Sequence, residues 1–117
     1  MSGPALTGNA LGPQKAKEAL EDILKALDQP ENYARLQEAK RAAGNDMLRH
    51  MQIVFPLVVQ MEMEVIENYG FAPDGEGVLQ FSQAIRSLER EHPDIARLRA
   101  RLELELIPRM MPPPLDN

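Results

Sequence analysis

Residues 47–68 constrain the fold of this chain more than any other stretch. Apolar residues recur there at spacings of three and four, which is the period of an α-helix. One narrow stripe of this helix carries Met47, Met51, Val54, Val58, Met61 and Val65. Neighbouring apolar residues widen the stripe to roughly 240° of the circumference, whereas a surface helix needs ~100°. A helix of this kind is either central in a bundle or shared with a partner chain.

Pro56 lies on the thin polar strip of that helix. A proline inside a helix removes the hydrogen bond to the carbonyl four residues back, here that of Gln52, and costs ~3 kcal/mol if nothing compensates. On the solvent side, water can satisfy this carbonyl while the helix bends around its core. We therefore predict one proline-kinked central helix. A β-strand is the alternative, because residues 53–59 are rich in β-branched side chains, but the flanks lack a period of two.

The length of 117 residues and an apolar content of 44% suit a single domain with one core. We expect residues 1–12, which are small and Gly-rich, to form a disordered tail. Residues 13–108 form the predicted helical domain. Residues 109–117 contain a proline run and are expected to form an extended, polyproline-type tail.

Proline, glycine and capping residues divide the domain into helices. The first helix is predicted from Pro13 to Asp28, because proline suits a first helical position. The second begins at Pro30 and runs, continuous or barely interrupted, to residue 69, where Gly70 ends it. The alternative is that Gly44 separates a short helix from the rest.

Two further helices complete the predicted fold. The third follows an N-cap at Asp74 and stops at His92, and the fourth begins at Pro93 and ends before Pro108. Residues 98–106 alternate apolar and charged side chains, so a strand is the alternative there. The predicted fold class is all-α, a four-helix bundle-like domain with short connections.

Composition excludes several classes of function. The net charge is −5 and the basic residues are dispersed, which argues against nucleic-acid binding. The chain has no cysteine, and therefore no disulfide or thiolate metal site. No signal-peptide pattern opens the sequence, and the apolar run at residues 53–59 is too short for a bilayer, which needs ~20 residues. We expect a cytoplasmic protein without a cofactor or an evident small-molecule substrate.

Four titratable residues support one chemical hypothesis, a metal-dependent helical-bundle enzyme. Glu89 and His92 have the Glu-x-x-His spacing of di-metal bundles, but this spacing occurs only once. His50 and Glu62 project into the apolar arc, where Glu62 could have a raised pKa. A hydrogen-bonded core histidine, a salt-bridged glutamate and a helix-end histidine are the simpler readings. No nucleophile accompanies these residues.

Two other motifs have simple explanations. Residues 74–77 (Asp-Gly-Glu-Gly) echo a calcium loop, but they lack its alternating oxygen ligands, so a turn with a helix cap explains them better. The later arginines lie among many acids and are expected to form a solvated face. These are Arg86, Arg90, Arg97, Arg99 and Arg101.

The central helix and the proline tail are the candidate partner-binding elements. Methionine suits surfaces that accept a partner, although core filling is the simpler role for Met47, Met51 and Met61. The residues that we expect to bind a protein partner, or a second copy in a homodimer, are Met47, Met51, Ile53, Leu57, Met61, Pro112, Pro113 and Pro114. The hypothesis is a non-enzymatic interaction or adaptor module.

Several short motifs also resemble one known family. They are Pro30-Glu31-Asn32, Asn45-Asp46-Met47, Val54-Phe55-Pro56, Glu64-Val65-Ile66, Tyr69-Gly70-Phe71 and residues 74–79 (Asp-Gly-Glu-Gly-Val-Leu). In order and spacing, from about residue 14 to 108, they resemble the small eukaryotic C-ten protein family. The resemblance implies an intracellular, non-enzymatic protein that is linked in vertebrates to nervous-system development, notably of the corpus callosum. It brings no catalytic residues. The tail differs, since vertebrate members look longer and richer in Ala and Ser.

Overall fold

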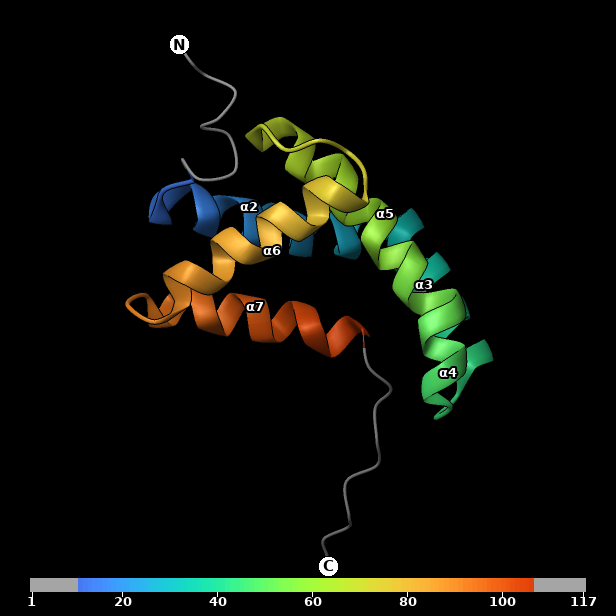
Figure 1. Ribbon diagram of the computed structural model, residues 1–117. Helices are drawn as coiled ribbons and strands as arrows, with labels where there is room; N and C mark the ends of the chain where they lie inside the picture. Colours follow the sequence, from blue (N-terminus) through green and yellow to red (C-terminus); the bar gives the residue numbers. More distant parts are fainter. Residues whose placement is uncertain (1–10, 107–117) are drawn as a thin grey trace, which may run out of the picture.

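The computed structural model describes residues 11–106, and every regular element in this range is helical (Figure 1). The predicted all-α class is therefore confirmed for these residues. The predicted tails, with Pro112, Pro113 and Pro114, lie largely or wholly outside them. The elements are α2 (Pro13–Asp28), α3 (Pro30–Ala43), α4 (Met47–Arg49), the π-helical turn η2 (His50–Val54), α5 (Phe55–Ile66), the 3-10 turn η3 (Glu67–Tyr69), α6 (Gly75–Glu89) and α7 (Pro93–Leu106).

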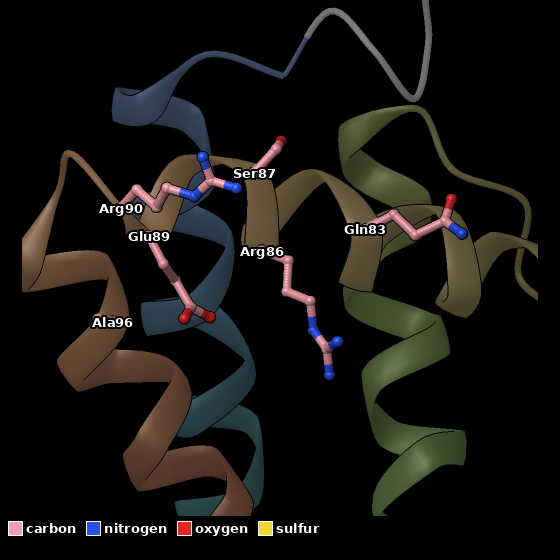
Figure 2. A pocket seen from close by; sticks show the side chains of 6 residues that line it. All are labelled: Gln83, Arg86, Ser87, Glu89, Arg90 and Ala96. Carbon is pink, nitrogen blue, oxygen red and sulfur yellow. The ribbon is translucent and has the colours of Figure 1, made fainter.

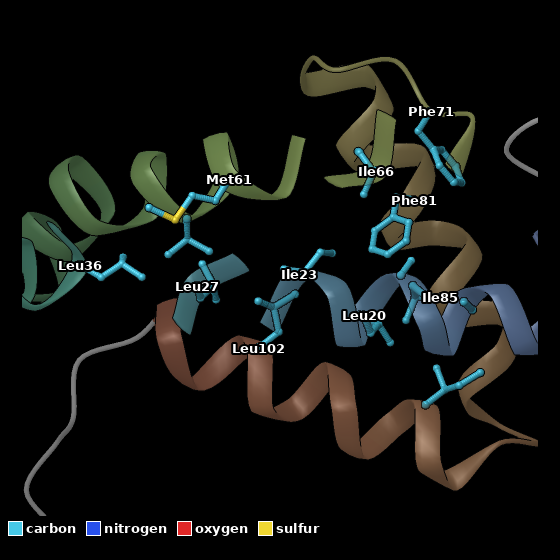
Figure 3. Packing of buried hydrophobic residues seen from close by; sticks show 14 of the residues in the cluster. Leu20, Ile23, Leu27, Leu36, Met61, Ile66, Phe71, Phe81, Ile85 and Leu102 are labelled. Carbon is cyan, nitrogen blue, oxygen red and sulfur yellow. The ribbon is translucent and has the colours of Figure 1, made fainter. Parts of the chain in front are cut away.

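Helix α2 lies at the centre of the core, packed against both α5 and α7. Its apolar residues recur at helical spacing, so they face these neighbours while the charged residues face solvent. In Figure 3, Ile66 and Phe81 lie on one side of α2 and Leu102 lies on the other. The buried side chains of α2 are Ala16, Ala19, Leu20, Ile23 and Leu27.

The predicted continuous or barely interrupted helix over residues 30–69 is wrong, and the alternative is confirmed, because the chain breaks at Gly44. Gly44 has φ 59° and ψ −134°, a conformation that a side chain strongly disfavours. Asp46 then starts a new helix, since its Oδ1 accepts hydrogen bonds from the backbone N–H groups of Leu48 (3.0 Å) and Arg49 (3.4 Å). The described residues therefore form five helices rather than the predicted four: α2, α3, the helix from α4 through α5, α6 and α7.

From Met47 to Ile66 the chain stays helical through α4, η2 and α5, but with one wider turn before Pro56. The N–H of Phe55 bonds to the carbonyl of His50, five residues back instead of four. Pro56 then lies in the first turn of α5, where a missing N–H is tolerated. The wide turn thus accommodates the proline within a helix that continues on both sides.

The wide turn also corrects the predicted apolar stripe. One extra residue in a turn shifts the register of the preceding segment by roughly 100°. As a result His50, rather than Met47 or Met51, points into the protein ahead of Val54. Met47 and Met51 are exposed, so the stripe that we predicted holds only from Val54 onward.

The connection after α5 is closed by local hydrogen bonds. Gly70 adopts φ 93°, and the N–H of Phe71 bonds to the Ile66 carbonyl at 3.2 Å, as a helix-ending glycine allows. The Phe71 ring meets that of Phe81 edge-on, at 5.5 Å between centroids. The N–H of Gly77 donates to Oδ1 of Asp74 at 2.9 Å, which confirms the predicted N-cap. This turn places α6 against α5 and α7.

Helix α7 includes residues 98–106. The alternative prediction of a strand there is therefore wrong. Its inner side buries Ile95 and Leu102. Arg99 links it to α6 through an ion pair with Glu89. At its other end, Lys40 Nζ of α3 lies 2.5 Å from Glu105 Oε1, which ties α7 to the α3 side of the molecule.

Candidate docking surface

The hairpin of α3 with α4 and η2 lies at one side of the molecule, away from the α6–α7 connection (Figure 1). Within it, Met47, Met51 and Phe55 follow one another at intervals of four residues, which places them along one side of the helix. They are 49%, 57% and 42% exposed, and Leu48 beside them is 62% exposed. Single exposed apolar residues are ordinary, but four in nine consecutive positions form a patch. We call these four residues the Met51 surface.

The predicted partner-binding residues separate into three groups in the structure. Met47 and Met51 lie on the Met51 surface. Ile53 is exposed, but the helical period places it on a different side, and Leu57 is half-buried against the core. Met61 is only 4% exposed and lies in the core, where its apolar neighbours enclose it.

Sequence reasoning did not single out two members of the Met51 surface, Leu48 and Phe55. Both are among the neighbouring apolar residues that widen the predicted stripe, and neither is among the predicted partner-binding residues. The signal that identifies Phe55 is its four-residue interval from Met51, continued from Met47. Leu48 carries no such signal, because its exposure depends on the wide turn that follows it.

The Met51 surface carries almost no charge. Arg49 is the only Lys, Arg, Asp or Glu between Met47 and Met61. Its Nη1 donates to the Ala42 carbonyl at 3.3 Å, so the guanidinium is turned back over the end of α3. A partner that covers this surface therefore does not have to strip water from a charged group there.

His50 lies directly behind this surface and is 2% exposed. Its Nδ1 is buried and has no hydrogen-bond partner. Such a group is uncommon in protein interiors, because its desolvation is uncompensated. The wide turn η2, which contacts both α3 and α7, turns this imidazole inward, where an α-helical register would place a methionine.

Glu62 is the second buried polar residue, 7% exposed within α5. Burial raises the pKa of its carboxyl group to about 7, because a charged carboxylate is poorly solvated there. This carboxyl is therefore partly protonated near neutral pH.

The structure does not assemble the residues of the metal hypothesis. Among residues 11–106, no three His, Cys, Asp or Glu side chains are grouped so that they could hold a metal ion. Glu89 is engaged by Arg99 instead, and His92 lies where α6 ends before α7. His50 and Glu62 are buried on η2 and α5, within the helix that runs from α4 through α5.

Two of the five arginines, Arg86 and Arg90, line an open, shallow depression of about 610 Å³ between α6 and α7 (Figure 2). The side chains of Arg86 and Arg90 point in different directions in this view, and Glu89 lies between them in sequence. Arg99 is paired with Glu89 and Glu103. The arginines therefore do not converge on one point, as an anion site requires. The lining residues are Gln83, Arg86, Ser87, Glu89, Arg90 and Ala96.

The fold defines a small all-α protein, and its most distinctive exposed feature is the apolar Met51 surface. No helix within residues 11–106 is long and apolar enough to cross a lipid bilayer. The sequence profile of the family described as Protein C10 matches residues 13–117. The chain therefore belongs to the Protein C10 family, as its sequence motifs suggested.

Curated relatives match over most of their length. Protein C10 of Xenopus tropicalis is 42% identical over 113 residues, which cover 97% of this chain and 88% of the relative. Protein C10 of Homo sapiens is 42% identical over 105 residues, which cover 90% and 83% of the two chains. Protein C10 of Danio rerio is 38% identical over 104 residues, or 89% and 85%. No solved structure matches this chain.

Proposed function

We propose that this chain is a non-enzymatic protein-interaction module that docks through the Met51 surface. One observation carries the proposal: Met47, Leu48, Met51 and Phe55 are exposed together on one helix. Apart from Ile53, the other exposed large apolar side chains of the described residues occur singly, one each on α3, α6 and α7. Contiguous apolar surface of this kind is characteristic of sites where proteins bind. Methionine and phenylalanine are among the residues enriched at such sites.

The position of the surface supports a docking role. Helix α4 continues directly into η2 and has no extensive contact with any other element, so the start of this helix is covered by little of the described chain. The core beneath depends on Val54 and Val58 instead, and both are fully buried. A partner could therefore cover the outer side without repacking the interior. The cytoplasmic location, and the developmental role that the family resemblance implies, are part of this proposal.

Site-specific photo-crosslinking in cells tests the docking role. A benzophenone amino acid at position 51 should crosslink to protein, and the same amino acid at position 79 should not. Leu79 is a matched control because it is 53% exposed but lies on α6. Equal crosslinking at the two positions, or none at position 51, contradicts the proposal.

A further inference from the structure

The spacing of the Met51 surface has a symmetry of its own. Met51 lies four residues after Met47 and four residues before Phe55. If two such helices cross antiparallel at Met51, each Met47 meets the partner's Phe55, and the two Met51 side chains meet on the axis. An isologous interface needs this kind of self-complementary patch.

We propose that the Met51 surface is the interface of a symmetric homodimer, with the two-fold axis at Met51. This inference rests on the proposed docking role and names its partner as a second copy of this chain. In the dimer, two hairpins pack face to face, each made of α3 with α4 and η2. Together they form a four-helix arrangement of the kind that two-helix hairpins often complete.

The area of the Met51 surface is sufficient for a homodimer interface. The four side chains are 42–62% exposed, which leaves roughly 400 Å² of apolar surface in each copy. Two copies together would bury roughly 800 Å² of apolar surface. Homodimer interfaces are ~65% apolar, so the corresponding total is roughly 1,200 Å², the lower limit of a stable interface. The expected dimer is therefore specific but of moderate affinity.

Charge also permits self-association. When two identical surfaces pack together, like groups come near one another, so a charged patch would repel its own copy and oppose dimer formation. In the antiparallel crossing, Arg49 lies level with the partner's Ile53 along the helix, and not level with the partner's Arg49. The hydrogen bond from Arg49 to the Ala42 carbonyl also directs its guanidinium away from the crossing point.

Cysteine crosslinking tests both the dimer and its register, because the chain has no cysteine of its own. Mild oxidation of the full-length Met51→Cys variant should give a disulfide-linked dimer, since the two positions meet on the axis. A mixture of Met47→Cys and Phe55→Cys chains should crosslink more than either chain alone. The Leu79→Cys variant is the matched control and should form no disulfide-linked dimer under oxidation, because position 79 is exposed on α6 and not on the Met51 surface.

A charge at the axis tests the same interface without crosslinking. Light scattering should give twice the 13.1 kDa chain mass for the wild type at high concentration. The Met51→Glu variant should dissociate at a concentration about 100-fold or more higher than the wild type, because two carboxylates would meet. The Leu79→Glu variant should remain dimeric, and circular dichroism verifies that each variant folds.

The outcomes separate this inference from the proposed function. A wild-type protein that is monomeric by light scattering, with no crosslink in the Met51→Cys variant, overturns the homodimer. If the Met47→Cys chain links to itself rather than to the Phe55→Cys chain, the antiparallel crossing is wrong. If the photo-crosslinker at position 51 captures only another protein, the dimer is wrong while the docking role stands. If it captures nothing, both are wrong.

Discussion

Gly77 packs so closely against Ala72 that a Cβ at position 77 would lie 1.7 Å from the Ala72 carbonyl oxygen. That contact holds the connection between η3 and α6 against the first turn of α6. The Asp74 cap closes the same turn, because its carboxylate accepts the N–H of Gly77. The close approach explains why a glycine is required in this sequence motif.

Replacing Gly77 with alanine should therefore destabilise the fold strongly. The backbone must move to make room, and we expect a loss of at least ~2 kcal/mol in the free energy of unfolding. The control is Gly75→Ala, because a Cβ at Gly75 meets nothing within 4 Å. Urea denaturation followed by circular dichroism measures both variants. Equal stability of the two would contradict the steric explanation.

Glu62 should make stability depend on pH. Burial raises its pKa from 4.5 to about 7, so the folded protein binds this proton more tightly than the unfolded chain does. The stabilising contribution is therefore complete below pH 4.5 and is lost as the pH rises to about 7. A shift of this size corresponds to up to about 3 kcal/mol.

The Glu62→Gln variant should remove this pH dependence. It should gain stability over the wild type at pH 8 and lose that advantage near pH 4, as measured by urea denaturation across the range. Glu64→Gln is the control, because Glu64 lies exposed on the same helix. If the stability of the wild type does not change between pH 5 and 7, the pKa of the Glu62 carboxyl group is not raised in the folded protein.

Pro56 should contribute little to the stability of this helix in either direction. A proline in an uninterrupted α-helix costs ~3 kcal/mol, so its removal would normally stabilise the protein by a similar amount. Here the wide turn η2 already places Pro56 in the first turn of α5. We expect Pro56→Ala to change the free energy of unfolding by less than ~1 kcal/mol.

A proline one turn further on should behave differently. Gln60 is exposed within α5, so Gln60→Pro should cost ~3 kcal/mol or more through its lost hydrogen bond and ring clash. Thermal unfolding compares the two variants directly. A large increase in stability on Pro56→Ala would contradict the prediction. It would indicate that the wide turn does not remove the destabilising effect of the proline.

The Lys40–Glu105 ion pair should couple α3 to α7 only weakly. The two side chains are 26% and 34% exposed, so water and salt screen their attraction. A double-mutant cycle of Lys40→Met and Glu105→Gln should give a coupling of about 1 kcal/mol or less, which falls in 0.5 M salt. A coupling that salt leaves unchanged would be inconsistent with this half-exposed geometry.

The helix boundaries could be predicted because their signals are local. Pro13, Pro30 and Pro93 open α2, α3 and α7, and the Asp74 and Gly70 termini have the predicted hydrogen bonds. The break at Gly44 could not be decided in the same way. A glycine costs only about 1 kcal/mol inside a helix, and tertiary contacts readily outweigh that amount.

The register of the helix from α4 through α5, which we predicted to be central, could not be predicted, because the period of 3.6 assumes hydrogen bonds four residues back. The bond from Phe55 to His50 breaks that assumption within one turn. Beyond the turn the prediction holds, so Val58, Met61 and Glu62 lie inside as their spacing indicated. Ahead of the turn it fails, and the docking role of Met47 and Met51 stays a prediction.

The Phe55–His50 hydrogen bond also determines which sulfur atoms an oxidant reaches. Met47 and Met51 present their thioethers to solvent, whereas Met61 is enclosed. In the monomer, peroxide should therefore convert Met47 and Met51 to sulfoxides well before Met61. Sulfoxides are polar, so this chemistry would make the outer side of the hairpin hydrophilic while the interior stays intact. The width of a single helical turn thus exposes the proposed docking surface to redox modification.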